Sequence, residues 1–132
     1  MKNHPKSYLG FHRLSPSKAL RDYVSCYWFI QRDVSIGEAF VEYLYPDGCI
    51  GMVFDLGDPF HFGDDVQRKG GFLDGTTTRA RRLMIGGEIH AVGVRFKPGC
   101  AYPFFPVPLS ELKNEIATLC ELGLSSAENL CD

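Results

Sequence analysis

The segment from Glu88 to Lys97 sets the strongest limit on the fold, because apolar and other residues alternate along it with a period of two. One face carries Val92, Val94 and Phe96, and the opposite face carries Gly93, Arg95 and Lys97. Alternation of this kind is typical of a β-strand with one buried face, and Pro98-Gly99 ends the strand in a turn. We therefore expect a β framework in which Val92, Val94 and Phe96 face the core.

Other short segments indicate further strands. Glu38 to Tyr45 predicts a strand, and the turn residues Pro46-Asp47-Gly48 predict a hairpin after it. The next strand, from Ile50 to Leu56, places its even-numbered residues on a buried face. The polar, Gly-rich residues 61–71 predict a loop, and the three arginines in 79–85 predict an exposed or edge strand.

Two segments have helical spacing. Ser15-Pro16-Ser17 can cap a short helix that runs to about Ser25, after which the aromatic and β-branched residues to Asp33 predict a strand. The second helix is predicted by four apolar residues at helical spacing, with Gly123 as its terminator: Leu109, Leu112, Ile116 and Leu119. We expect a mainly β (α+β) fold, a barrel or sandwich, with a short N-terminal helix and C-terminal helices.

The last residues predict the start of another helix. Ser125 and Glu128 have the spacing of a capping box, but few residues remain before Asp132. We therefore expect the chain to be cut from a longer protein.

Length and charge limit the classes of function. The 132 residues suffice for one domain, 1–132, and not for two. The net charge of -2 argues against direct binding of nucleic acid. The sequence contains no signal-peptide pattern and no apolar run that could span a bilayer, so we expect a cytoplasmic protein without a membrane partner.

Motifs for catalysis or metal binding are missing from the sequence. His61, Asp64 and Asp65 form the nearest group of metal ligands, but they fall in the predicted loop. Cys49 and Cys100 follow turns and are more typical of buried filler than of nucleophiles. We expect no catalytic residue, no metal and no cofactor, and we interpret the protein as a non-enzyme.

Five residues are candidates for a small-molecule pocket, because such sites combine apolar walls with a few polar groups. They are Trp28, Tyr43, Tyr45, Phe54 and Arg95. The alternative interpretation makes the aromatic residues ordinary core and leaves Arg95 as an outward strand residue.

Several motifs occur in a fixed order: Tyr45-Pro46-Asp47-Gly48-Cys49, then residues 54–59, then Gly93 to Ala101 followed by Phe104-Phe105, then residues 109–112. Together they resemble the N-terminal domain of one branch of AraC-type transcriptional regulators, from about Leu20 to Leu122. The resemblance implies a cupin-like β-barrel that senses a small effector or mediates dimerisation. It also implies that DNA is bound only by a separate C-terminal helix-turn-helix domain, absent from this sequence.

The resemblance leaves other functions open. Cys100 and Pro106 depart from the small residues that are common at these positions in that branch. A homodimer could form through the predicted helix face of Leu109, Leu112, Ile116 and Leu119. The alternative function is a free-standing cupin-like enzyme or small-molecule-binding protein.

Overall fold

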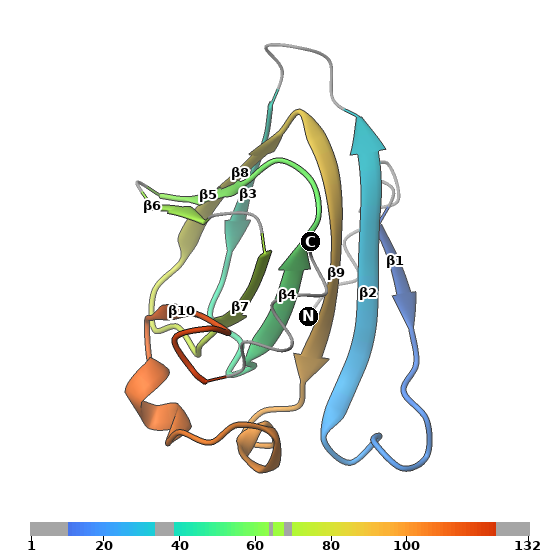
Figure 1. The fold of residues 1–132 in the computed structure, drawn as a ribbon, viewed down its shortest axis with the longest axis vertical. Helices are drawn as coiled ribbons and strands as arrows, with labels where there is room; N and C mark the ends of the chain where they lie inside the picture. Colours follow the sequence, from blue (N-terminus) through green and yellow to red (C-terminus); the bar gives the residue numbers. More distant parts are fainter. Residues whose placement is uncertain (1–10, 34–38, 64, 68–69, 124–132) are drawn as a thin grey trace.

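The computed structural model describes residues 11–33, 39–63, 65–67 and 70–123, and it contains two antiparallel β-sheets packed face to face (Figure 1). The strand order of sheet A is β1 (Phe11–Leu14), β2 (Val24–Asp33), β9 (Glu88–Phe96), β4 (Gly51–Asp55), β7 (Gly70–Asp74) and β10 (Ile116–Thr118). That of sheet B is β3 (Ala39–Leu44), β8 (Arg81–Gly86), β5 (Phe60–Phe62) and β6 (Asp65–Gln67). The mainly β prediction is confirmed. Among the described residues, the two sheets form a sandwich and do not close into a barrel.

The long strands β2 and β9 form the centre of sheet A. They pair antiparallel from Val24 opposite Phe96 to Asp33 opposite Glu88, with one register shift between Val24 and Cys26. Both strands are rich in β-branched and aromatic residues, which pack well on a pleated surface. Strand β4 pairs with the other edge of β9, so β9 has a partner on each side.

The core between the two sheets, which we call the inter-sheet core, takes apolar side chains from both of them. Its buried members are Ile30, Val53, Phe60, Phe62, Phe72, Leu83, Ile85, Ile89 and Ala91. A second cluster, which we call the outer core, lies on the opposite face of sheet A. There the C-terminal segment, residues 105–123, covers the strands with buried residues that include Phe105, Leu112, Ala117, Leu119 and Leu122.

Sheet A has apolar contacts on both faces, so the single buried face predicted for two strands is incomplete: Phe96 and Ile50 of the predicted faces are buried in the outer core, but the opposite faces are buried as well. In β9, Ile89 and Ala91 point into the inter-sheet core, whereas Val92 is 38% exposed. In β4, Val53 faces the inter-sheet core and Phe54 packs against the outer core. Period-two alternation identifies the two faces of a strand, but it does not say which one a second sheet will cover.

Both predicted helices are corrected by the structure. Residues 18–23 form turns, and β2 begins at Val24, because pairing with β9 outweighs a helix too short to be stable. Leu109–Leu112 is a single 3₁₀ turn, labelled η3, and Ile116–Thr118 is the strand β10. Asn114 separates them with a φ of 59°, a conformation that does not occur inside an α-helix. The helix predicted from Ser125 lies outside the described residues.

Asn114 holds the C-terminal segment to the end of β7. Its backbone N–H donates to the Thr76 carbonyl oxygen at 2.7 Å. Its side-chain Oδ1 accepts from the Thr78 N–H at 2.9 Å, and its Nδ2 donates to Thr78 Oγ1 at 2.9 Å. Asparagine tolerates the left-handed conformation, and these bonds fix the point at which the chain turns from η3 to β10.

Three other predictions also change. The segment after Leu44 crosses from sheet B to sheet A, so Pro46–Gly48 does not close a hairpin. The predicted loop 61–71 includes β6 and parts of β5 and β7. Strand β8 pairs with both β3 and β5, so it is not an edge strand.

A glycine in β9 leaves space for the single tryptophan. A Cβ atom at Gly93 would lie 2.3 Å from two carbon atoms of the Trp28 indole. Phe11 stacks on the same indole, with 5.8 Å between ring centroids. Side chains on both sheets pack around Trp28, so its ring cannot move away freely.

We predict that Gly93→Ala lowers the free energy of unfolding by about 1–3 kcal/mol, because the added methyl group overpacks the site. Gly51→Ala is the matched control on the neighbouring strand, since its nearest contact would be an ordinary 3.8 Å. We expect the control to leave stability unchanged or raise it by up to about 1 kcal/mol. Urea unfolding followed by tryptophan fluorescence measures both values, and equal losses in the two variants would contradict the prediction.

Candidate functional site: an apolar hollow on sheet A

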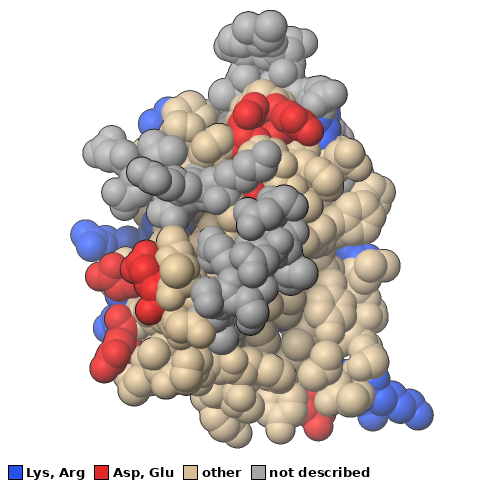
Figure 2. Space-filling view, viewed as in Figure 1, with Lys and Arg blue, Asp and Glu red and all other residues tan. Residues whose placement is uncertain are grey.

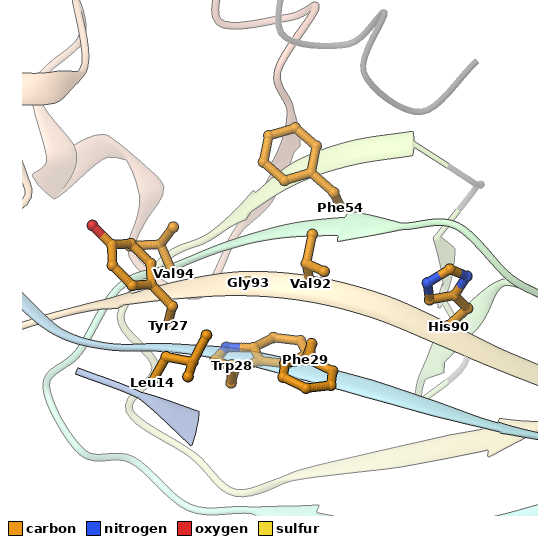
Figure 3. A pocket seen from close by; sticks show the side chains of 9 residues that line it. All are labelled: Leu14, Tyr27, Trp28, Phe29, Phe54, His90, Val92, Gly93 and Val94. Carbon is orange, nitrogen blue, oxygen red and sulfur yellow. The ribbon is translucent and has the colours of Figure 1, made fainter. Parts of the chain in front are cut away.

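An apolar hollow lies on the face of sheet A that points away from sheet B, beside the part covered by the C-terminal segment. It has a volume of about 340 Å³. Nine residues of β1, β2, β9 and β4 line it: Leu14, Tyr27, Trp28, Phe29, Phe54, His90, Val92, Gly93 and Val94 (Figure 3). In the view of Figure 2, the charged side chains of the described residues lie mainly near the outline of the molecule, and uncharged residues occupy most of the described surface between them.

Strand register explains why these residues meet. Cross-strand partners in neighbouring strands point to the same face of a sheet. Two such rows cross the hollow, with Leu14, Tyr27 and Val94 in one row and Phe29, Val92 and Phe54 in the other. Trp28 lies against Gly93 on the inter-sheet side, so it supports the floor of the hollow.

The lining is apolar, and the residues that the structure describes do not fully cover it. Leu14 is 58% exposed, Phe29 37% and Val92 38%, which leaves a continuous apolar surface open. Among the nine lining residues, Tyr27 and His90 carry the polar or titratable side chains that point to this face, and none of the nine is Asp, Glu, Lys or Arg. An apolar wall with few polar groups is typical of a small-molecule site.

The five residues predicted to line a pocket do not converge. Trp28 and Phe54 both line the hollow. Tyr43 and Tyr45 are 57% and 72% exposed and belong to β3 and the crossover after it, in or next to the other sheet. Arg95 lies at the end of β9 and forms an ion pair with Asp47, at 2.5 Å between Nη2 and Oδ2.

Sequence reasoning missed most of the lining residues, including Leu14, Tyr27, Phe29, His90 and Val92. Tyr27, Phe29 and the even-numbered residues of β9 stand at strand spacing, which could have identified one shared face. Their meeting with Leu14 depends on the pairing of β1 with β2, which the sequence does not specify.

The ion pair of Arg95 links two of the sequence motifs. Asp47 belongs to the crossover between the sheets, and its Oδ1 also accepts a hydrogen bond from the Cys49 N–H at 2.9 Å. Burial alone would lower the pKa of Arg95, but the Asp47 carboxylate raises it above its usual range, so the guanidinium stays charged. We interpret Arg95 as a structural residue that holds the crossover to β9.

Cys49 lies beside this ion pair, yet its surroundings do not activate the thiol. Burial raises the pKa of Cys49, the Arg95 guanidinium opposes this effect, and the Asp47 carboxylate adds to it. The net pKa is raised, so the thiol stays protonated at neutral pH. A nucleophilic cysteine requires the thiolate, which this site disfavours.

The residues predicted to form a dimer surface lie against the chain's own sheets. Leu112 and Leu119 are buried in the outer core, and Leu109 packs against that core. Ile116 packs against the inter-sheet core. A dimer contact through Leu112 or Leu119 would require the C-terminal segment to detach from sheet A.

No group of three or more metal-ligating side chains occurs in the part of the chain that the structure describes. His61 belongs to β5, whereas Asp64 and the side chain of Asp65 lie outside the described residues. Among the described residues, no helix is long and apolar enough to cross a membrane.

A family model described as a domain of unknown function, DUF6597, matches residues 12–118. The chain belongs to the DUF6597 family. The match runs from β1 to the last residue of β10, so the DUF6597 domain includes both sheets and the strand that covers the edge of β7. No curated protein and no solved structure matches the chain.

A second ion pair of the DUF6597 domain joins Asp74 and Arg81, and burial disfavours the charged form of Asp74. Asp74 of β7 accepts a hydrogen bond from Arg81 Nη2 at 2.8 Å, and both side chains are mostly buried. Burial raises the pKa of Asp74, and the Arg81 guanidinium offsets this effect only in part. Asp74 Oδ1 has no hydrogen-bond partner among the described residues, which is consistent with a carboxylate that is incompletely stabilised.

We predict that Asp74 makes the DUF6597 domain less stable as the pH rises. The folded-state pKa of Asp74 is above the unfolded value of about 3.9, so the folded chain binds the proton more tightly. The resulting stabilisation is present below the unfolded pKa and is lost as the pH rises through the folded pKa. Asp74→Asn cannot titrate and retains an oxygen that can accept from Arg81.

Urea unfolding of the two proteins at several pH values from about 3.5 to 7 checks this sign. The Asn variant removes the contribution of Asp74 and retains those of all other carboxyl groups. We expect the unfolding free energy of the natural protein to fall relative to the variant as the pH rises. A relative increase would show that the ion pair stabilises the folded carboxylate.

Proposed function

We propose that this DUF6597 domain is the regulatory domain of an AraC-type transcription factor, and that the hollow on sheet A holds a small-molecule effector. The observation that carries the proposal is the apolar surface of β1, β2 and β9, bounded by aromatic side chains, which the described residues leave partly exposed. The ordered motifs that resemble AraC-type regulators support the regulatory part. Two of those motifs are held together by the ion pair of Asp47 and Arg95.

The chemistry of the lining favours a flat, uncharged and mainly apolar effector. No carboxylate, ammonium or guanidinium belongs to the lining, so a charged ligand would lose its hydration without gaining an opposite charge. Tyr27 and Phe29 offer aromatic surface, and Tyr27 and His90 offer polar atoms that could orient the ligand. The volume of about 340 Å³ lies within the range of small-molecule sites.

Two valines of similar exposure, one on each sheet, allow a controlled test. Val92 is in the floor of the hollow, and Val41 lies on β3 in sheet B; they are 38% and 45% exposed. We expect Val92→Glu to weaken binding of N-phenyl-1-naphthylamine, an uncharged aromatic fluorophore, by at least about tenfold, or about 1.4 kcal/mol. Val41→Glu adds the same charge outside the hollow and should leave the affinity unchanged.

Fluorescence titration measures the dissociation constant of the probe for the three proteins, and circular dichroism verifies that each variant is folded. Equal affinities of the two variants would place the probe elsewhere and contradict the assignment of the hollow. A screen of uncharged aromatic metabolites by thermal shift would then extend the test to natural effectors, because a ligand that binds only the folded state raises its stability.

The regulatory assignment has a separate test in the gene. An AraC-type regulator requires a DNA-binding region, so we expect the encoding gene to continue after Asp132 with two helix-turn-helix motifs and a basic recognition helix. Reading the gene past this codon gives the answer. A stop codon at that position, or a following domain of another type, would contradict the regulatory assignment while leaving the hollow as a ligand site.

A further inference from the structure

We propose that Phe54 couples occupancy of the hollow to the docking of the C-terminal segment on sheet A. The inference rests on the proposed function in one respect, that the hollow takes a ligand. It adds the route by which a bound ligand changes another part of the chain.

Phe54 has contacts on two sides. It lines the hollow, and it also packs against the outer core that the C-terminal segment covers. Leu119 and Phe54 come together above Gly71, since a Cβ atom at Gly71 would lie 2.6 Å from Leu119 Cδ1 and 3.1 Å from Phe54 Cε1. The absence of a side chain at Gly71 therefore leaves the space in which the two residues meet.

Leu119 anchors the last described part of the chain. Its side chain is fully buried, and its N–H donates to the Gly71 carbonyl oxygen at 3.1 Å. The residues around it form a compact turn in which the Glu121 N–H donates to Thr118 Oγ1 at 3.1 Å and Thr118 Oγ1 donates to Glu121 Oε1 at 3.0 Å. Movement of Leu119 would thus involve this turn as well.

The strand pairing of this segment with sheet A is limited, although its apolar side chains are buried there. Strand β10 contains three residues and pairs only with β7, at the edge of the sheet. Short edge elements open locally at a lower free energy than central strands such as β9. A modest change in the packing of Leu119 is therefore sufficient to change how often the segment opens.

The direction of the coupling follows from the position of the ring. The described residues bury the Phe54 side chain only partly, and the side of the ring that faces the hollow is accessible to a ligand. A ligand in the hollow would pack on that side and restrict the ring, which lowers the entropy cost of its contact with Leu119. Binding should therefore stabilise the docked segment, and by reciprocity a weakened segment should lower the ligand's affinity by the same factor.

Hydrogen exchange of the complete chain, with and without saturating N-phenyl-1-naphthylamine, tests the coupling. We expect the probe to slow exchange of the Leu119 amide by about fivefold or more. The Gly63 amide, which donates to the Arg82 carbonyl oxygen in sheet B, is the internal reference. If the probe slows exchange of the Leu119 amide more than exchange of the Gly63 amide, the coupling is supported. Equal slowing of the two amides, or no slowing at Leu119, overturns it.

Two conservative variants locate the contact. Leu119→Val removes the δ-carbon that approaches Phe54 above Gly71, and Leu122→Val shortens another buried leucine of the same segment as the control. We expect Leu119→Val to abolish the selective protection and weaken probe binding by about fivefold, and Leu122→Val to retain both. Equal effects of the two variants would overturn the role of Phe54 and Leu119.

The outcomes separate the two proposals. Probe that binds the natural chain at the hollow without changing exchange at Leu119 overturns the coupling and leaves the proposed function intact. If the probe does not bind, or binds the Val92→Glu protein with the same affinity, the hollow is not a ligand site. In that case both the proposed function and the coupling are contradicted. If Leu119→Val does not fold, the exchange of the natural chain alone decides.

Discussion

The structure depends on sheet A being covered on both faces. Strands β4 and β9 carry apolar side chains on each side, so packing against sheet B alone would leave one apolar face in water. Residues 105–123 cover much of that second face and bury Leu112, Ala117 and Leu119 there. This requirement explains why the segment lies flat against the sheet with one short strand, instead of forming the amphipathic helix that its leucine spacing predicts.

The motifs that resemble AraC-type regulators hold the crossover between the two sheets and supply packing contacts of sheet A. Asp47 accepts hydrogen bonds from Arg95 and from the Cys49 N–H, which fixes the crossover from β3 to β4 against the end of β9. Gly93 provides space for the Trp28 ring, and Phe96 packs between Phe104 and Phe105. Packing and hydrogen bonding therefore explain these motif residues. Of the residues that line the candidate ligand site, the ordered motifs include Phe54, Gly93 and Val94.

The strands could be predicted from the sequence much better than their arrangement. Alternation and β-branched residues identified β9 and the segments of β3, β4 and β8, because these signals are local. The assignment of strands to two sheets depends on pairing between distant residues, so the crossover after Leu44 was not predictable from Pro46–Gly48. The helix expected from Leu109 failed because Asn114 and the pairing of β10 with β7 outweigh helical spacing. For the site, Trp28 and Phe54 were identified as aromatic residues, but the rows that include Leu14 and Val92 arise only from strand register.

Among the described residues, the C-terminal segment covers one end of the outer apolar face of sheet A, and the hollow lies toward the other end. The row that contains Phe54 continues from Gly71, where Leu119 covers the sheet, to Val92 and Phe29, which remain partly exposed. Among the described residues, the hollow is therefore the partly exposed end of the apolar surface whose other end forms the outer core. Because one sheet face carries both, a molecule that fills the open end contacts residues that also hold the C-terminal segment. This shared apolar surface is the physical basis of the proposed coupling between ligand binding at the hollow and docking of the C-terminal segment.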